Sequence, residues 1–238
     1  MSNNPKIVSN KKNLEVLYED NHIIAVNKRV GDIVQGDKTG DKPLSDVVKE
    51  YIKDKYNKPG EVYLGVVHRL DRPTTGIVVF ARTSKALTRL NDLFKNRETQ
   101  KTYWAVVKNK PEPYEGNLVH YLTRNEKSNT SKAHTKEVAE SKKASLDYRV
   151  IAVLSNYTAL EINLHTGRHH QIRAQLAAIG SPIKGDLKYG ADRSNPDGGI
   201  HLHARRLTFI HPVSKDDIDI IAPVPHDPVW DAVSQNHH

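Results

Sequence analysis

Two alternating apolar segments near the middle of the chain constrain its fold more than any other feature. Leu146, Tyr148 and Val150 alternate with other residues, and the same spacing returns over residues 160–164. A period of two is typical of strands that bury one face. The polar pair at 155–156, between the two segments, favours a short turn. The chain is therefore expected to form an antiparallel hairpin with one buried face.

Further segments carry strand-like or helix-like spacing. The strand-like segments are residues 14–17, 22–26, 62–70, 77–80 and 101–107. The segments with apolar residues at helical spacing are residues 43–52, 84–94 and 170–179, with Pro43 in a first turn, Ser84 as a cap and Gly180 as a stop. A strand-rich order with a few interspersed helices predicts an α+β fold, with a mixed, mainly antiparallel sheet and flanking helices.

Two polar segments lack this spacing. Residues 1–13 show no periodicity and are predicted to be a flexible N-terminus, which leaves residues 14–238 as one domain. Residues 123–143 are mostly small or charged, and Val138 is their only large apolar residue. This composition predicts a mobile, mildly basic arm or a long hairpin loop.

Composition narrows the class of protein. The 238 residues include no cysteine, which excludes a disulfide scaffold, a thiolate zinc site and a cysteine nucleophile. Lysine and arginine number 36 against 28 aspartate and glutamate, and the resulting charge of +8 favours a polyanionic partner such as nucleic acid. The chain shows no signal peptide and no apolar run near the roughly 18 residues that span a bilayer. The expectation is a soluble cytoplasmic protein without a membrane partner.

The segment that carries chemistry is the loop expected between residues 70 and 77. From His68 the sequence reads HRLDRPTTG, so that Asp71 stands in a loop flanked by two arginines. Nearby arginines favour the ionised form of a carboxyl group, which suits a nucleophile or a base. Taken alone, the residues leave open whether Asp71 is such a group or a turn residue that pairs with an arginine.

This segment resembles the HRLD-x-x-T-S-G signature of RluA-type pseudouridine synthases, with Thr75 in place of serine. Other motifs of that family occur in the same order, at residues 18–28, 101–103, 164–173, 180–190 and 202–212. The chain departs from the family pattern at Arg29, His169 and Ser181, where proline, threonine and histidine are usual. The motifs begin near residue 18, so the chain is expected to lack the small N-terminal RNA-binding domain that many relatives carry.

The resemblance implies an isomerase that converts uridine to pseudouridine in transfer or ribosomal RNA, without cofactor or metal. It assigns residues 14–238 to the catalytic domain, expected to act as a monomer on RNA. Asp71 is implied to attack the ribose or to remove a proton from it, Tyr103 to stack on the uracil, and Arg173 to pair with Asp71. The residues implied to bind substrate are His68, Arg69, Arg72, Thr75, Arg168, Gln171, Ile172 and Leu202. For Arg69, a wedge that fills the place of the extruded base and a plain phosphate contact remain equal alternatives.

Two other functions stay open at this point. His165, His169 and His170 have the spacing of helical ligands, and His201 and His203 share one face of a strand, which is compatible with a metal-dependent hydrolase. Two observations argue against a metal site. A glycine interrupts the first group of histidines, and no HExxH motif or carboxylate partner is present. The other alternative is a non-catalytic RNA-binding protein, which would not need an acid facing the RNA.

Overall fold

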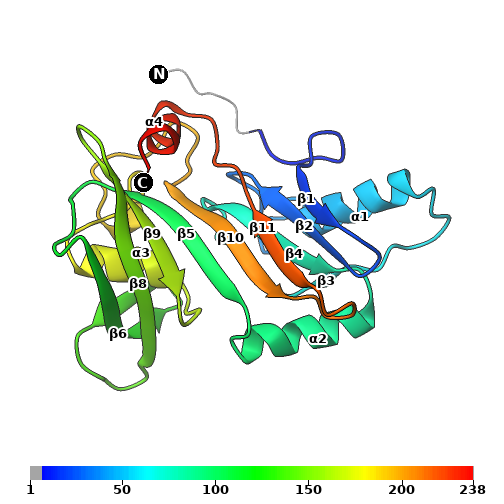
Figure 1. Cartoon of the computed structure of the whole chain (residues 1–238), viewed down its shortest axis with the longest axis horizontal. Coiled ribbons are helices and arrows are strands. Elements are labelled where there is room, and N and C mark those ends of the chain that lie inside the picture. Colours follow the sequence, from blue (N-terminus) through cyan, green and yellow to red (C-terminus); the bar gives the residue numbers. More distant parts are fainter. Residues whose placement is uncertain (1–6, 238) are drawn as a thin grey trace. The chain divides into compact units, whose positions relative to one another are not determined.

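The computed structural model describes residues 7–237 and places them in eleven strands and four α-helices (Figure 1). In chain order these are β1 (Val16–Glu19), β2 (Ile23–Lys28), α1 (Leu44–Lys55), β3 (Gly65–Val66), β4 (Thr75–Ala81), α2 (Ser84–Lys95), β5 (Gln100–Val107), β6 (Glu115–Asn125), β7 (Thr130–His134), β8 (Lys142–Val153), β9 (Thr158–Leu164), α3 (Gln171–Ala178), β10 (Leu202–Ile210), β11 (Asp217–Ile221) and α4 (Pro228–Asn236), with a 3-10 turn at Leu187–Tyr189. The prediction of an α+β fold with a mixed, mainly antiparallel sheet and flanking helices is confirmed.

The described residues form two compact units. The first holds the chain up to Lys101 together with Ala204–Val224, and the second holds Thr102–His203 together with the segment from Pro225. None of the helices between residues 7 and 237 combines the length and the apolar character that crossing a membrane requires.

The sheet of the first unit centres on β2 and β4, which pair with each other in antiparallel register. All residues of both strands are buried, so the apolar residues in each form an unbroken run, 23–26 in β2 and 77–81 in β4, and do not alternate with polar ones. Alternate residues of these strands, together with Ala86 and Leu90 of α2 and the inner face of β11, form the core of this unit. Gly76, the second residue of β4, has φ near 113°, and a Cβ there would lie 2.4 Å from the carbonyl oxygen of Ala204, so only glycine fits.

The strand predicted over residues 62–70 is wrong except at Gly65 and Val66, which form β3. Antiparallel pairing with β4 stops there because the next backbone N–H of β4, that of Val79, donates to the ring nitrogen Nε2 of His68 at 3.0 Å. A side-chain acceptor replaces the ladder carbonyl, and the chain leaves the sheet. Periodicity cannot reveal such an exchange, since the pattern of apolar residues is unchanged by it.

The N-terminal part of the described chain is held more firmly than its composition suggests. Ser9 donates from its N–H and its hydroxyl to the carboxylate of Asp32, at 2.8 and 2.6 Å. Arg29 joins the same network, because its N–H donates to Asp32 at 3.2 Å and its Nη2 to the carbonyl of Asn13 at 3.0 Å. These bonds attach Ser9 and Asn13 to the segment that follows β2. The flexible N-terminus over residues 1–13 stays a prediction, and its first six residues lie outside the described range. A proline, usual in the family at Arg29, could not donate the N–H bond.

The hairpin predicted from the alternating segments is confirmed as β8 and β9, which pair in antiparallel register. In the second unit the strands follow the order β5, β9, β8, β6, β7. Their inner faces pack on α3, which Figure 1 shows behind β8 and β9, in a core that includes Leu146, Leu160, Ile162 and Leu176.

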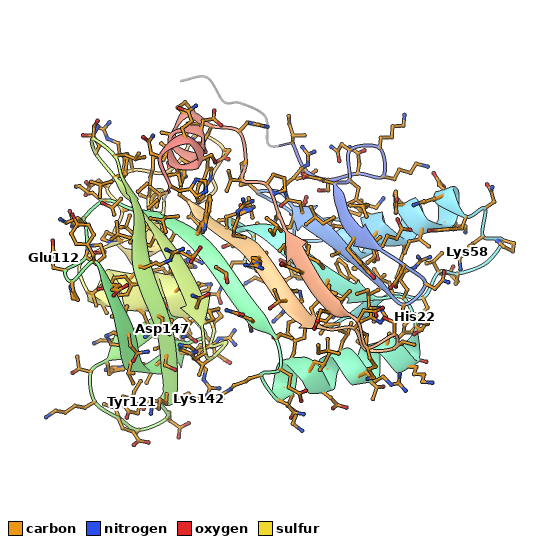
Figure 2. All side chains as sticks on the ribbon, viewed as in Figure 1. His22, Lys58, Glu112, Tyr121, Lys142 and Asp147 are labelled. Carbon is orange, nitrogen blue, oxygen red and sulfur yellow. The ribbon has the colours of Figure 1, made fainter. Side chains whose placement is uncertain are left out.

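The segment 123–143 is not a loose arm. Its first residues complete β6, residues 130–134 form β7 against β6, and β8 starts at Lys142. Tyr121 and Lys142 lie close together where β6 meets β8 (Figure 2). The hairpin alternative of the prediction is thus nearer the structure, because backbone pairing, and not apolar side chains, orders this polar segment.

The ends of α2 and α3 have ordinary caps, but the residue predicted to cap α2 is wrong. α2 is capped by the hydroxyl of Thr83, which accepts the N–H of Ala86 at 3.1 Å, and not by Ser84 as predicted. Gly180 ends α3 in the left-handed region, and the N–H groups of Gly180 and Ser181 return to the carbonyls of Ala177 and Leu176. The predicted stop at Gly180 is confirmed.

Candidate active site

Asp71 lies in the first unit, in the turn that leads into β4. Its backbone carbonyl accepts the N–H of Thr74 at 3.0 Å. The preceding Leu70 is 8% exposed and the following Thr75 is 3% exposed, whereas Asp71 itself is only partly buried. The turn therefore places the partly buried Asp71 between two buried anchors, as catalytic loops on a rigid sheet commonly do.

The buried side chain of Lys28 holds the backbone that follows Asp71. Its Nζ donates to three backbone carbonyls, including those of Arg72 at 3.1 Å and Thr74 at 2.7 Å. Burial lowers the pKa of Lys28 to about 7, against the charges of Asp32 and Asp71, which raise it. Lys28 was not among the predicted site residues, although it stands in one of the family motifs recognised in the sequence.

His68 supports the segment that precedes Asp71. In addition to accepting the N–H of Val79, its ring packs on Phe94 with the centroids 4.8 Å apart. Burial lowers the pKa of His68 to about 3, with a smaller contribution from the charge of Lys101, so the neutral ring can accept a hydrogen bond. This geometry does not support the predicted contact of His68 with RNA and favours a structural role.

Replacing His68 by phenylalanine should lower the free energy of unfolding by about 1–3 kcal/mol, because the ring packing is kept while the buried N–H of Val79 loses its acceptor. Glutamine, which can accept, should lose less. Protonation of His68 opposes folding because its folded-state pKa is depressed, so the stability of the wild type should fall as the pH drops from about 6.5 toward 3. The glutamine variant should fall less over that window.

Urea unfolding followed by circular dichroism, repeated at neutral and acidic pH, measures both effects. Amide hydrogen exchange at Val79 provides the local control, since only this N–H loses its partner in the phenylalanine variant. A phenylalanine variant as stable as the wild type, with unchanged exchange at Val79, would show that the hydrogen bond is unimportant.

In the second unit, three predicted site residues gather on one side of the sheet. Ile172 and Leu202 belong to the buried cluster between the sheet and α3, and Tyr103 packs against that cluster while staying partly exposed. Tyr103 shares this face with Ala105, as alternation along β5 requires. The side of the sheet that carries α3 is therefore also the side that presents the tyrosine ring.

Arg173 is buried on α3 and forms a bidentate ion pair with Asp186. Its Nε and Nη2 donate to the two carboxylate oxygens at 2.7 and 2.8 Å, and the two side chains are 6% and 1% exposed. Nη1 lies 3.1 Å from Nε2 of His170, and the guanidinium lies over the ring of Tyr189. The pairing of Arg173 with Asp71 that the resemblance implies stays a prediction.

Gln171 is occupied by the loop that precedes α3. Its Oε1 accepts from the hydroxyl of Thr166 at 2.7 Å and from the N–H of Arg168 at 3.0 Å, and its Nε2 donates to the carbonyl of Ser145 at 3.0 Å. The side chain of Arg168 in turn donates from Nε to the carbonyl of Lys143 at 3.0 Å. These bonds do not support direct substrate binding by Gln171, and they hold Arg168 at the start of β8.

His169, one of the departures from the family pattern, joins the start of α3 to the β6–β7 hairpin. Its ring stacks on His170 with centroids 3.8 Å apart. The hydroxyl of Ser131 lies 2.9 Å from its Nδ1 and donates to its carbonyl oxygen at 2.8 Å, while the N–H of Ser131 donates to the hydroxyl of Tyr189 at 2.8 Å. Threonine offers neither a ring to stack on His170 nor a ring nitrogen to Ser131, so these two contacts depend on the substitution, whereas the bond to the backbone carbonyl does not.

Arg69 and Arg72, which were also predicted to bind substrate, differ in exposure and in ion pairing. Arg69 is exposed beside the Asp71 turn. Arg72 is ion-paired with Asp37 and Asp41 of the loop between β2 and α1. Arg69 and Arg72 therefore carry two positive charges next to Asp71, one of them already paired within the first unit.

The histidines do not assemble a metal site within the described residues. α3 begins at Gln171, so His165 and His169 are not on the helix as their spacing had suggested. His165 instead pairs with Asp147 on β8, at 2.6 Å, and His201 with Asp227, at 3.0 Å. Across residues 7–237 no group of three or more histidine, aspartate or glutamate side chains could hold a metal ion.

Comparison with known proteins gives one consistent result. Residues 22–178 match the family model described as RNA pseudouridylate synthase. The tRNA pseudouridine synthase C of Vibrio cholerae is 31% identical, over 91% of this chain and 93% of the relative. The ribosomal large subunit pseudouridine synthase D of Xylella fastidiosa is 33% identical, over 90% of this chain and 67% of the relative.

The fold agrees with these sequence matches. The solved structure of human RNA pseudouridylate synthase domain containing 4 superimposes with a TM-score of 0.77 at 23% identity, covering 93% of this chain and 92% of the human one. The matched region includes the Asp71 turn, β5 and all of α3. This chain therefore belongs to the RNA pseudouridylate synthase family of isomerases.

Proposed function

We propose that the chain isomerises uridine to pseudouridine in transfer or ribosomal RNA, with Asp71 as the catalytic carboxylate. The observation that carries the proposal is the Asp71 turn, which fixes the partly buried Asp71 between buried anchors. The relatives named for transfer RNA and for ribosomal RNA support both substrate classes. Cytoplasmic location and a monomeric state stay predictions from the sequence.

The reaction exchanges one bond of the nucleotide for another. The bond from N1 of uracil to the ribose breaks, the free base turns over, and carbon 5 joins the same ribose carbon. Carbon 5 then loses its proton and N1 gains one, so atoms and electrons balance without a redox partner. Asp71 starts this sequence either by attacking the ribose or by taking a proton from it, and both routes require its ionised form.

Tyr103 and Arg173 are proposed as the other catalytic residues. Tyr103 presents a partly exposed ring above an apolar cluster, which supports stacking on the free uracil, an interaction worth roughly 1–3 kcal/mol per base. Arg173 brings a buried, permanently charged guanidinium whose orientation is fixed by Asp186. We propose Ile172 and Leu202 as the apolar wall beside the base.

Pseudouridine mapping of total RNA from cells with and without the gene tests this function. We expect one or a few positions in transfer or ribosomal RNA to lose pseudouridine when the gene is deleted and to regain it when the gene is restored. Restoration with an Asp71→Asn copy is the matched control and should fail. Unchanged maps across all RNA classes would contradict the proposal.

A further inference from the structure

Arg72, the residue after Asp71, is surrounded by oxygen atoms of a single loop. Its Nη1 donates to Asp41 at 2.6 Å, and its Nη2 lies 3.0 Å from the hydroxyl of Thr39 and 3.4 Å from Asp37. The hydrogen bonds to Asp41 and Asp37 raise the pKa of the guanidinium further, so Arg72 stays charged. One loop thus offers a set of oxygen acceptors and two negative charges to one arginine.

This set of acceptors resembles what an RNA phosphate would offer to the same arginine. A phosphate presents negatively charged oxygens to the forked donors of a guanidinium, as two carboxylates do here. The likeness lies in the negative charge and in the placement of the acceptor oxygens. Because Arg72 directly follows Asp71, we expect the backbone of a uridine on which Asp71 acts to pass near this arginine.

Arg72 and the loop that carries Asp37 and Asp41 differ in how firmly they are held. The carbonyl of Arg72 is fixed by Lys28 and by the N–H of Gly31 at 3.0 Å, so its backbone is anchored. The loop residues 36–42 are all exposed, and the side chains of Asp37 and Asp41 are 42% and 59% exposed. Ion pairs this exposed contribute little to stability, so Arg72 can change partner at small cost.

We propose that Arg72 binds a phosphate of the substrate RNA, and that Asp37 and Asp41 compete with this phosphate for the guanidinium in the free protein. The loop between β2 and α1 then sets how tightly RNA is held beside Asp71. The inference rests on the proposed function, because it takes RNA as the substrate. It adds a competitor within the chain that lowers the affinity for those RNAs that place a phosphate at Arg72.

Neutralising both carboxylates provides the test. In the Asp37→Asn/Asp41→Asn variant each asparagine keeps a side-chain oxygen. The N–H of Thr39 can therefore still donate to the side chain at position 37. Binding of unfractionated transfer RNA, followed by fluorescence anisotropy, should become about three- to tenfold tighter at low salt. The gain should shrink as salt rises, because exposed ion pairs are screened.

The gain must depend on Arg72 if competition is its cause. Arg72→Gln alone should weaken binding, and adding Arg72→Gln to the asparagine pair should abolish the gain. Glu50→Gln/Asp54→Asn on α1 is the matched control, since it removes the same charge from two exposed carboxylates whose ion-pair partners are lysines. This control should change affinity by no more than about twofold.

An equal gain with and without Arg72, or an equal gain in the α1 control, would show a general effect of charge and overturn the competition. Absence of any gain would overturn it as well. The readout is RNA binding without turnover, so failure here is distinct from failure of the proposed function. That failure would appear as unchanged pseudouridine maps, or as a wild-type protein that binds no RNA.

Discussion

Asp71→Asn should abolish pseudouridine formation while leaving the protein folded and able to bind RNA. Asparagine has nearly the size and hydrogen-bonding reach of aspartate, but its amide neither attacks a ribose carbon nor takes up a proton at neutral pH. Removal of a catalytic nucleophile or base commonly costs several orders of magnitude in rate, and we expect a loss of at least about a thousandfold. The hydrogen lost from carbon 5 supplies the assay, because RNA labelled with tritium at that carbon releases tritium only on turnover.

Asp217→Asn is a suitable control, because Asp217 is an exposed carboxylate on β11 in the same unit. It should keep full activity. Circular dichroism and RNA binding by the Asp71 variant should match the wild type. Substantial turnover by Asp71→Asn would remove Asp71 from the mechanism and leave the family membership unaffected.

Sequence patterns predicted best those elements that bury a single face. The β8–β9 hairpin and α1 were confirmed because alternation, or helical spacing, follows directly from one buried side. α3 shows the limit of this logic. The position of α3 was predicted correctly, and Ile172, Leu176 and Ile179 do pack on one apolar cluster. Burial nevertheless extends around the helix to all six residues from Gln171 to Leu176, which the apolar pattern did not predict. The strand predicted over 62–70 failed because one side chain, His68, took the place of a backbone acceptor.

Some features of the candidate site could likewise be predicted from the sequence, and others could not. Motif resemblance located Asp71, Tyr103 and Arg173, but it could not supply the partners that orient them. Asp186 lies 13 residues from Arg173, and Asp41 lies 31 residues from Arg72, so neither pair is visible in local spacing. Gln171 and His68 were expected to meet substrate because they stand in the motifs. Their hydrogen bonds within the protein give both side chains a structural role, and their contact with substrate stays a prediction.

Asp186→Asn should lower the free energy of unfolding of the second unit by about 3–5 kcal/mol, the usual cost of removing one partner of a buried ion pair. The cost arises because the guanidinium of Arg173 stays buried while it loses the charge that offsets its desolvation. Trp104 and Trp230 are the two tryptophans of the chain and both lie in this unit, so fluorescence during urea unfolding reports on the unit itself. The midpoint should fall with little change in slope.

The double variant Arg173→Met/Asp186→Leu separates stability from catalysis. Replacing both charges with apolar side chains of similar size removes the unpaired charge, so most of the lost stability should return. Pseudouridine formation should not return, because Arg173 is proposed to act in the reaction and methionine carries no charge. Restored activity in the double variant would reduce Arg173 to a structural role. A loss below about 1 kcal/mol in Asp186→Asn would show that this ion pair contributes little to the stability of the second unit.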